Sequence, residues 1–313
     1  MAPKKLLGFW DLMSISLGQI IGTGVVVLTG ISISMTGYGA PLAFVLALGI
    51  VAIPSLCIAS LGSSIPNTGG NYTYVRDLLG RKTSFIYLML LIAGQIILAS
   101  FAIGFAQYAD ALLPNINTMI VAAVVMVLCY LANLLGIKTA ARIQALMVLI
   151  LLVSLVIYII SGLGHVENFS AYTQPRNIFP SGFAGFFAAA FLLRLSLIGS
   201  EFISEFGGEM KNPGTMIPRV MGLSLLLVTC LYVGIAIVAT GVLPLAEVEG
   251  KNLAAVAKVI FSPTAYIGFI ATIVTFFIVS VVPTGWLLYT FMPIMALGGF
   301  AGVVMRTILS YQV

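Results

Sequence analysis

Charged residues are scarce in this chain. They make up 7% of its 313 residues, whereas hydrophobic residues make up 61%. A soluble domain carries about 25% charged residues. This composition excludes an ordinary soluble protein and indicates an integral membrane protein surrounded by the lipid bilayer. The small net charge of +5 fits contact with anionic lipid at one membrane face, so we expect no nucleic-acid partner.

Histidine and cysteine are also scarce. The only histidine, His165, falls in a loop between apolar runs, which argues against a histidine-based metal site. Cys57, Cys129 and Cys230 lie inside apolar runs, so we expect small buried thiols rather than disulfides or metal ligands. The sequence shows neither a Walker-type phosphate-binding loop nor a buried nucleophile–base pair. ATP-driven pumping, enzymatic catalysis and a bound cofactor or metal are therefore not expected.

Long apolar runs are what the chain does contain. A bilayer-spanning helix needs about 20 apolar residues, and eight runs meet or approach this length. They are residues 9–33, 40–63, 84–111, 118–136, 142–163, 184–206, 220–242 and 264–300. The last run contains Pro283 and Pro293, so its end is poorly defined. Between the last two runs, Leu253–Phe261 is apolar enough for a short helix, although a plain connector is the alternative.

Basic residues are distributed unevenly between the loops. With the N-terminus in the cytoplasm, ten basic residues face the cytoplasm, and three, Arg176, Lys251 and Lys258, face outside. The ten are Lys4, Lys5, Arg76, Arg81, Lys82, Lys138, Arg142, Lys211, Arg219 and Arg306. Membrane proteins carry their excess of basic residues in cytoplasmic loops. We therefore expect a multi-pass protein of the cell (plasma or inner) membrane with both termini in the cytoplasm, and with its first run retained rather than cleaved as a signal peptide.

Glycine is concentrated at the centre of the first run. Gly18, Gly22 and Gly24 fall within it, and a glycine in a helix interior costs about 1 kcal/mol relative to alanine. We therefore expect this helix to break there, as transporter helices do at their binding sites. A second interruption is expected at Gly199-Ser200. The alternative is that these small residues only allow close helix packing.

Three stretches carry a resemblance to a known family. The first is Gly18-Gln19-Ile20-Ile21-Gly22-Thr23-Gly24-Val25. The second runs from Pro66 through Gly69-Gly70-Asn71-Tyr72-Thr73-Tyr74. The third joins Gly199-Ser200-Glu201, Gly208-Glu209-Met210-Lys211-Asn212-Pro213 and Ile217-Pro218-Arg219. In this order they resemble the amino acid–polyamine–organocation (APC) transporter superfamily, over roughly residues 6–260.

The resemblance implies an all-α membrane protein with a five-plus-five inverted-repeat (LeuT-like) fold. Residues 1–163 would form the first repeat, residues 164–183 an extracellular loop, and residues 184–313 a partial second repeat with an atypical C-terminal end. Because scaffold spans of the second repeat would then be missing, the chain is expected to be a truncated form. We expect it to bind substrate weakly or not at all on its own and to show no uptake.

An amino acid or related amine carries charges that a mid-membrane site compensates with backbone groups, because charged side chains are costly there. The N–H groups of a broken helix attract a carboxylate. We assign this role in the first run to Ile21, Gly22, Thr23, Gly24 and Val25. The resemblance assigns the substrate's amino group to the carbonyls of Leu197, Ile198, Gly199 and Ser200. Glu201, which is nearest the second break, would contact a cation or gate the pocket.

Charged residues around the second break allow several roles. Glu201, Glu205 and Glu209 are spaced at i, i+4 and i+8, which places them on one face of an α-helix. This stripe predicts an inner gate or exit path formed by Glu205 and Glu209, although Glu209 would alternatively be solvated. Arg194, about one turn before the break, would snorkel outward, pair with Glu201 or attract an anionic substrate.

The coupling ion is only weakly indicated. The resemblance implies that sodium-independent relatives often have a lysine in the fifth span, where this chain has Leu151. A sodium ion would need oxygen ligands, which Thr272, Thr275, Ser280 and Thr284 offer in the last run. These hydroxyls would alternatively bond to their own backbone. Coupling to Na⁺, coupling to H⁺ and exchange of substrates all stay open.

Together, the residues and the resemblance predict a secondary active transporter (permease), a symporter or antiporter, for amino acids or related amines. It would work by alternating access around a mid-membrane site. The alternative is a non-transporting sensor or partner subunit of the same fold. Small-residue faces on the fourth, fifth and eighth spans favour helix contacts over lipid, which would suit an oligomer.

Overall fold

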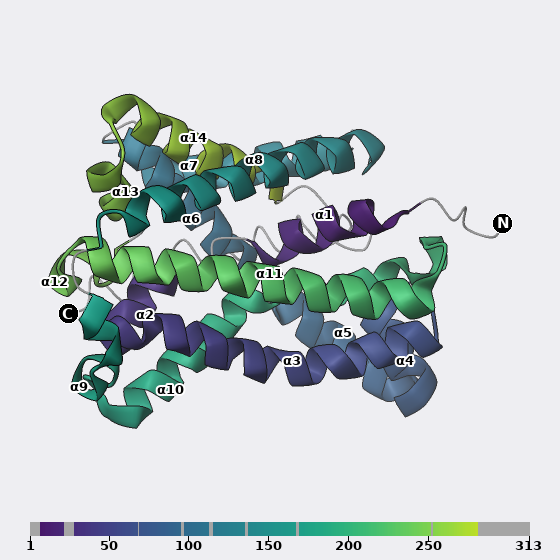
Figure 1. Ribbon diagram of the computed structural model, residues 1–313. Helices are drawn as coiled ribbons and strands as arrows, with labels where there is room; N and C mark the ends of the chain where they lie inside the picture. Colours follow the sequence, from purple (N-terminus) through teal and green to yellow (C-terminus); the bar gives the residue numbers. More distant parts are fainter. Residues whose placement is uncertain are drawn as a thin grey trace, which may run out of the picture.

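The computed structural model describes residues 7–21, 28–67, 69–94, 97–112, 115–134, 137–166, 169–251 and 253–280. Within these residues every regular element is a helix, as the sequence predicts (Figure 1). The α-helices are α1 (Phe9–Ile20), α2 (Thr29–Thr36), α3 (Ala40–Ser64), α4 (Gly70–Leu79), α5 (Arg81–Gly94), α6 (Ile97–Leu112), α7 (Thr118–Leu134), α8 (Ile137–Leu163), α9 (Pro175–Ile178), α10 (Gly182–Leu193), α11 (Pro213–Val242), α12 (Leu245–Val248), α13 (Ala254–Ile260) and α14 (Pro263–Ser280). The 3-10 helices are η2 (Gly37–Gly39), η3 (Phe169–Thr173), η4 (Arg194–Leu197) and η5 (Ser200–Glu209).

Two long helices, α3 and α11, lie side by side in opposite directions through the middle of the molecule (Figure 1). Both are rich in apolar residues, with leucine frequent in each, and both begin with proline in the first turn, where its missing N–H costs nothing. On one side, α2 and α10 pack against α3. On the other, α1 and α8 pack against α11, and α6, α7 and α14 continue the layer.

The core and the surface of this bundle are both apolar. Phe44, Leu155 and Tyr232 are fully buried, and the rings of Phe44 and Tyr232 meet with centroids 5.4 Å apart. On the outer side of α3, however, Leu42 and Leu56 are 48% and 70% exposed. A surface of this kind is stable only against an apolar environment such as lipid.

The predicted spans match the helices closely where the structure describes them. The first run is two helices, α1 and α2, and the run predicted at 84–111 corresponds to α5 and α6. Three described segments are long and apolar enough to cross a membrane: Thr29–Ser64, Gly182–Glu209 and Pro213–Val242. The run predicted at 264–300 begins as α14, and its residues beyond Ser280 lie outside the described part.

The prediction of buried cysteines is wrong for two of the three. Cys57 on α3 and Cys230 on α11 are free thiols on exposed positions of their helices. An apolar run in a membrane protein does not distinguish a core position from a lipid-facing one, because both faces are apolar. The side chain of Cys129 lies outside the described part.

The loops gather at two opposite ends of the bundle (Figure 1). The start of α1, the end of α3, α4 and the start of α11 share one end, and α9, α12 and α13 share the other. The short helix predicted at Leu253–Phe261 is confirmed as α13. At this end the Tyr172 hydroxyl donates to the carbonyl of Ile237 (2.7 Å) and so ties η3 to α11. Burial raises the pKa of the Tyr172 hydroxyl to about 12.

The assignment of these ends to the two sides of the membrane is a testable prediction. In a cysteine-free background, Glu247→Cys, at an exposed position of α12, should react in intact cells with a membrane-impermeant maleimide. Asp77→Cys, exposed on α4, should react only after the membrane is permeabilised. The opposite labelling pattern would reverse the orientation derived from the basic loops.

Candidate functional site

The first apolar run is interrupted where its glycines predict. Helix α1 ends at Ile20, and Ile21 is buried and extended, with φ −76° and ψ 102°. The chain is helical again in α2, which begins at Thr29. Of the five residues predicted to bind the carboxylate, Ile21 is therefore at the edge of the break. Gly22, Thr23, Gly24 and Val25 lie outside the described residues.

The second run is interrupted at Ile198–Gly199, also as predicted. Helix α10 passes into η4, after which Ile198 is extended (φ −72°, ψ 140°). Gly199 follows with φ +141°, a conformation that residues with a Cβ rarely adopt, and η5 begins at Ser200. The four residues predicted to bind the amino group of the substrate, Leu197 to Ser200, thus form the break itself.

The structure brings the two interruptions into direct contact. A Cβ on Gly199 would lie 2.7 Å from the carbonyl carbon and oxygen of Gln19 and 2.9 Å from the nitrogen of Ile20. The other ends of α1 and η5 also meet, where Leu7, just before α1, donates its N–H to the carbonyl of Glu209 (3.2 Å). The two helices therefore lie side by side in opposite directions. Helices α2 and α10 pair on the other side of the breaks.

Polar groups at the second break are only partly satisfied. The Gly199 N–H donates to Oε2 of Glu201 at 2.9 Å, so this carboxylate caps the start of η5. The Ser200 hydroxyl is fully buried and has no hydrogen-bond partner among the described residues. A buried hydroxyl without a partner is costly, and a bound ligand is one way to satisfy it.

Tyr232 is a residue of this site that the sequence reasoning missed. Its hydroxyl donates to the carbonyl of Ile20 at 3.3 Å, one of the carbonyls left free where α1 ends. Nearby, the hydroxyls of Ser16 and Ser224 are 2.7 Å apart in a fully buried pair. The signal in the sequence is slight: one tyrosine and one serine in the long apolar run of α11.

The predicted acidic stripe does not form one face. Residues 200–209 form a 3-10 helix rather than an α-helix. With three residues per turn, positions i, i+4 and i+8 are rotated from one another by about 120°. Glu201, Glu205 and Glu209 therefore point in different directions around η5, and the shared face that suggested an exit path is wrong.

Glu205 instead lies against the loop between α3 and α4. A Cβ on Gly70, at the start of α4, would overlap the side chain of Glu205. Gly208 donates its N–H to the carbonyl of Asn67 (3.3 Å), and a Cβ on Gly207 would lie 3.0 Å from the backbone of the same residue. The loop thus closes on η5 through glycines and main-chain atoms.

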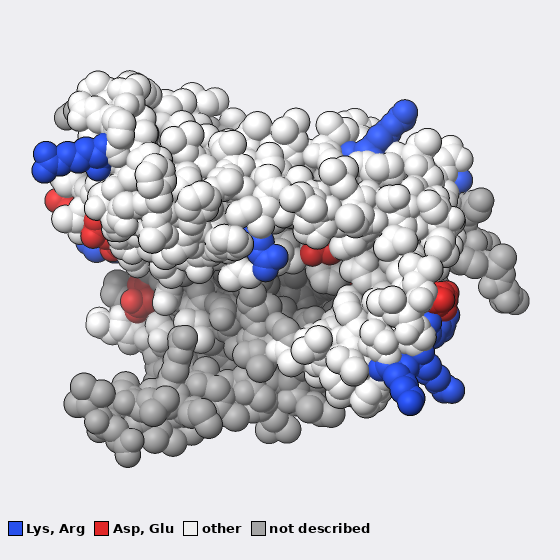
Figure 2. All heavy atoms as spheres, turned by 90° about the horizontal axis from the view of Figure 1, so that it is seen from below, with Lys and Arg blue, Asp and Glu red and all other residues white. Residues whose placement is uncertain are grey.

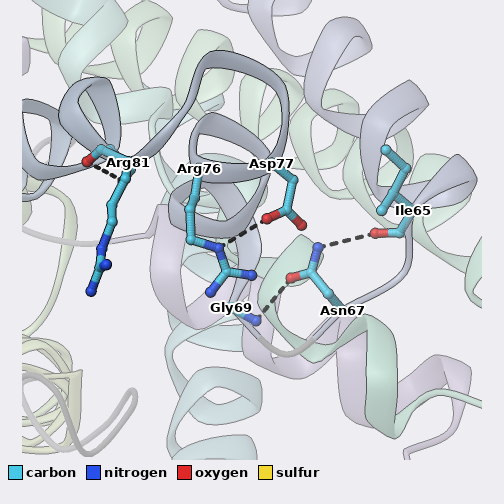
Figure 3. A network of polar contacts seen from close by, with 7 residues as sticks. Ile65, Asn67, Gly69, Arg76, Asp77 and Arg81 are labelled. Atoms are coloured by element: carbon cyan, nitrogen blue, oxygen red, sulfur yellow. Dashed lines mark hydrogen bonds and ion pairs between the residues drawn. The ribbon is translucent and has the colours of Figure 1, made fainter.

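The loop is held in shape by the side chain of Asn67 (Figure 3). Its Nδ2 donates to the carbonyl of Ile65 (3.0 Å), and its Oδ1 accepts from the N–H of Gly69 (2.8 Å). Beside it, Arg76 and Asp77 form an ion pair at 2.9 Å on the surface of α4. Exposed ion pairs contribute little to stability, so the amide of Asn67 is the main local constraint.

Charged residues occupy a few places on the face seen in Figure 2. Figure 2 shows basic and acidic atoms gathered at the two ends of one face, and further ones near its middle. Among the described basic residues, Arg194 is the one that lies inside a candidate span away from its ends. Its guanidinium makes no hydrogen bond or ion pair with any residue that the structure describes. The predicted pairing with Glu201 is therefore absent among these residues.

The residues predicted to bind sodium are only partly described. The hydroxyl of Thr272 donates to the carbonyl of Phe269 (2.7 Å), which is the back-bonding alternative to an ion ligand. Thr275 and Ser280 belong to α14, but their side chains lie outside the described part, as does Thr284 altogether. Leu151, at the position where some relatives would carry a lysine, is buried in α8.

Comparison with known proteins gives a consistent family match. The family model described as amino acid permease matches residues 7–306. The branched-chain amino acid permease BcaP of Bacillus subtilis is 30% identical over 274 residues, which cover 80% of this chain and 57% of that protein. The serine/threonine exchanger SteT of the same organism is 28% identical, covering 74% and 53%. Cationic amino acid transporter 1 of Arabidopsis thaliana is 31% identical, covering 73% and 41%. The chain thus spans about half the length of these curated relatives.

Proposed function

Because the chain belongs to the amino acid permease family of the APC superfamily, whose members are membrane transporters rather than enzymes, we propose that it binds an amino acid or related amine where its two broken helices meet. The observation that carries this proposal is the contact of Gly199 with the backbone of Gln19 and Ile20. Two interrupted spans with touching breaks are the usual form of a mid-membrane substrate site.

The carboxylate of the substrate would bind at the first break. Helix α2 begins at Thr29 after the interruption, so its first N–H groups and the positive end of its dipole point back toward the break. Gly22, Thr23 and Gly24 would let the substrate approach the main chain closely, with the hydroxyl of Thr23 as an additional donor.

The amino group of the substrate would bind at the second break. The carbonyls of Leu197 and Ile198 end η4 without a helical partner. The carboxylate of Glu201, already held in place by the N–H of Gly199, would supply the compensating negative charge. The Ser200 hydroxyl, buried and without a partner among the described residues, would complete the site.

We further propose the inverted-repeat organisation, with residues 1–163 as the first repeat and residues 184–313 as part of the second. The support is geometric: α1 pairs with η5 in the opposite direction, α2 pairs with α10, and the two breaks lie at the same level. Alternating access would then rock these paired segments against the remaining helices. A cell-membrane location with both termini in the cytoplasm completes the proposal, with Na⁺, H⁺ or a second substrate as the coupled species.

The experiment is a binding measurement with matched glycine variants. Of the two outcomes expected for a chain that lacks part of its second repeat, we propose weak binding: in lipid nanodiscs the chain should bind at least one of a panel of L-amino acids, at millimolar ligand, in equilibrium dialysis. Gly24→Leu should lower that affinity at least tenfold, about 1.4 kcal/mol or more, because its side chain occupies the place of the carboxylate. Gly222→Leu is the control, since Gly222 is exposed on α11 with open space around it. Equal affinities of Gly24→Leu and Gly222→Leu would show that the first break is not part of the binding site.

A further inference from the structure

The inference concerns the class of substrate, and it rests on the proposed function. Arg194 begins η4 and lies four residues before the break at Ile198. At about 2 Å of rise per residue, this is roughly 8 Å along the 3-10 axis. This distance is comparable to the length of an arginine side chain, so a guanidinium directed toward the break would meet the side chain of a substrate held there.

No acidic residue of the chain that the structure describes compensates this guanidinium. Eight of the nine acidic residues lie in the described part, and Glu167 is the exception. None of the eight forms an ion pair with Arg194. The carboxylate nearest in sequence, Glu201, is engaged with the N–H of Gly199. Residues 22–27 and 281–313, which the structure does not describe, contain no aspartate or glutamate at all.

Two unsatisfied polar groups therefore flank the second break. One is the guanidinium of Arg194, partly buried inside a span. The other is the fully buried hydroxyl of Ser200, which has no partner among the described residues. A charge inside a membrane span is usually paired or lines a substrate path. The guanidinium of Arg194 carries only N–H donors, in a planar fork that matches a carboxylate, whereas the Ser200 hydroxyl stays with the amino-group site.

We propose that Arg194 binds a second anionic group on the substrate, so that the site takes an α-amino acid with an acidic side chain. The α-carboxylate and α-amino group occupy the two breaks as above, and the side-chain carboxylate accepts hydrogen bonds from the Arg194 guanidinium. Arg194 is then the residue that distinguishes an acidic amino acid from its neutral amide.

The test compares L-glutamate with L-glutamine, which have the same shape and differ in charge. The full 313-residue chain in lipid nanodiscs should bind L-glutamate at least tenfold more tightly than L-glutamine in equilibrium dialysis. Arg194→Gln should abolish this ratio while leaving the affinity for L-glutamine within threefold. Arg194→Lys, which keeps the charge and loses the bidentate geometry, should retain part of the preference. Arg219→Gln, at an exposed position of α11, is the control and should bind as the unmodified chain does.

The outcomes separate this inference from the proposed function. If L-leucine or L-lysine binds and L-glutamate does not, the site exists and the role of Arg194 is refuted. An equal loss of both ligands in Arg194→Gln would show a structural role and would also refute it. If no amino acid binds, the proposed function fails and this inference fails with it. Should Arg194→Gln not fold, the ratio in the unmodified chain and in Arg194→Lys still decides the question.

Discussion

Gly199→Ala should abolish substrate binding and strongly destabilise the protein. The added methyl would lie 2.7–2.9 Å from backbone atoms of Gln19 and Ile20, and backbone atoms inside a helix cannot move aside as a flexible side chain can. The φ of +141° adds strain for any residue with a Cβ. Strain at such a position costs about 1–3 kcal/mol, and overpacking costs about 1–3 kcal/mol more. We expect a marked loss of thermal stability in nanodiscs and no measurable binding.

Two glycine controls separate the causes of this loss. Gly182 also has a positive φ (+69°), but a Cβ there would meet nothing within 4 Å, so Gly182→Ala should show the strain without the collision. Gly222 lies inside α11 with open space around it, so Gly222→Ala should be neutral or stabilising by up to about 1 kcal/mol. If Gly199→Ala unfolds no more easily than Gly182→Ala, the two breaks do not touch as described.

Gly30→Ala should release the loop that covers α2. Gly30, the second residue of α2, accepts a hydrogen bond from the N–H of Gly250 (2.9 Å), and its missing side chain leaves room for the backbone of Lys251. A methyl group there would overlap the carbonyl of Lys251. The loop must then move away, which loses the hydrogen bond and its packing. We expect a loss of stability of about 1–3 kcal/mol.

Trypsin gives a direct measure of this release, because it cleaves after Lys251. In Gly30→Ala, cleavage at this bond should be at least several-fold faster than in the unmodified chain, since proteolysis follows local opening. Gly49→Ala, on an exposed position of α3 with nothing within 4 Å, should leave the cleavage rate unchanged. Unchanged cleavage in Gly30→Ala would mean that the loop is not held through this contact.

The sequence was sufficient to locate the breaks but not their contact. Glycines and a loss of helix propensity are local signals, and they place the interruptions at Ile21 and at Gly199 correctly. The packing of Gly199 on Gln19 joins segments that lie far apart in the chain. Nothing local encodes it. The hydrogen bond from Tyr232 to the carbonyl of Ile20 was not predicted for the same reason.

The acidic stripe shows where periodicity reasoning fails. The spacing of Glu201, Glu205 and Glu209 predicts one face only if the backbone is α-helical. Gly207 and Gly208 have poor helix propensity, and both pack against the backbone of Asn67. Residues 200–209 wind as the tighter 3-10 helix η5, which places the three glutamates at different angles around its axis.

The closure between the α3–α4 loop and η5 has an energetic consequence. Glycines and main-chain atoms form much of it, with the 3.3 Å hydrogen bond from Gly208 to Asn67 as its polar link. Separating such surfaces uncovers little hydrocarbon, and water replaces the broken hydrogen bond at a net cost of about 1 kcal/mol. Opening this end would therefore cost little through these contacts. A ligand needs only a small difference in affinity for the opened and closed arrangements to change which one predominates.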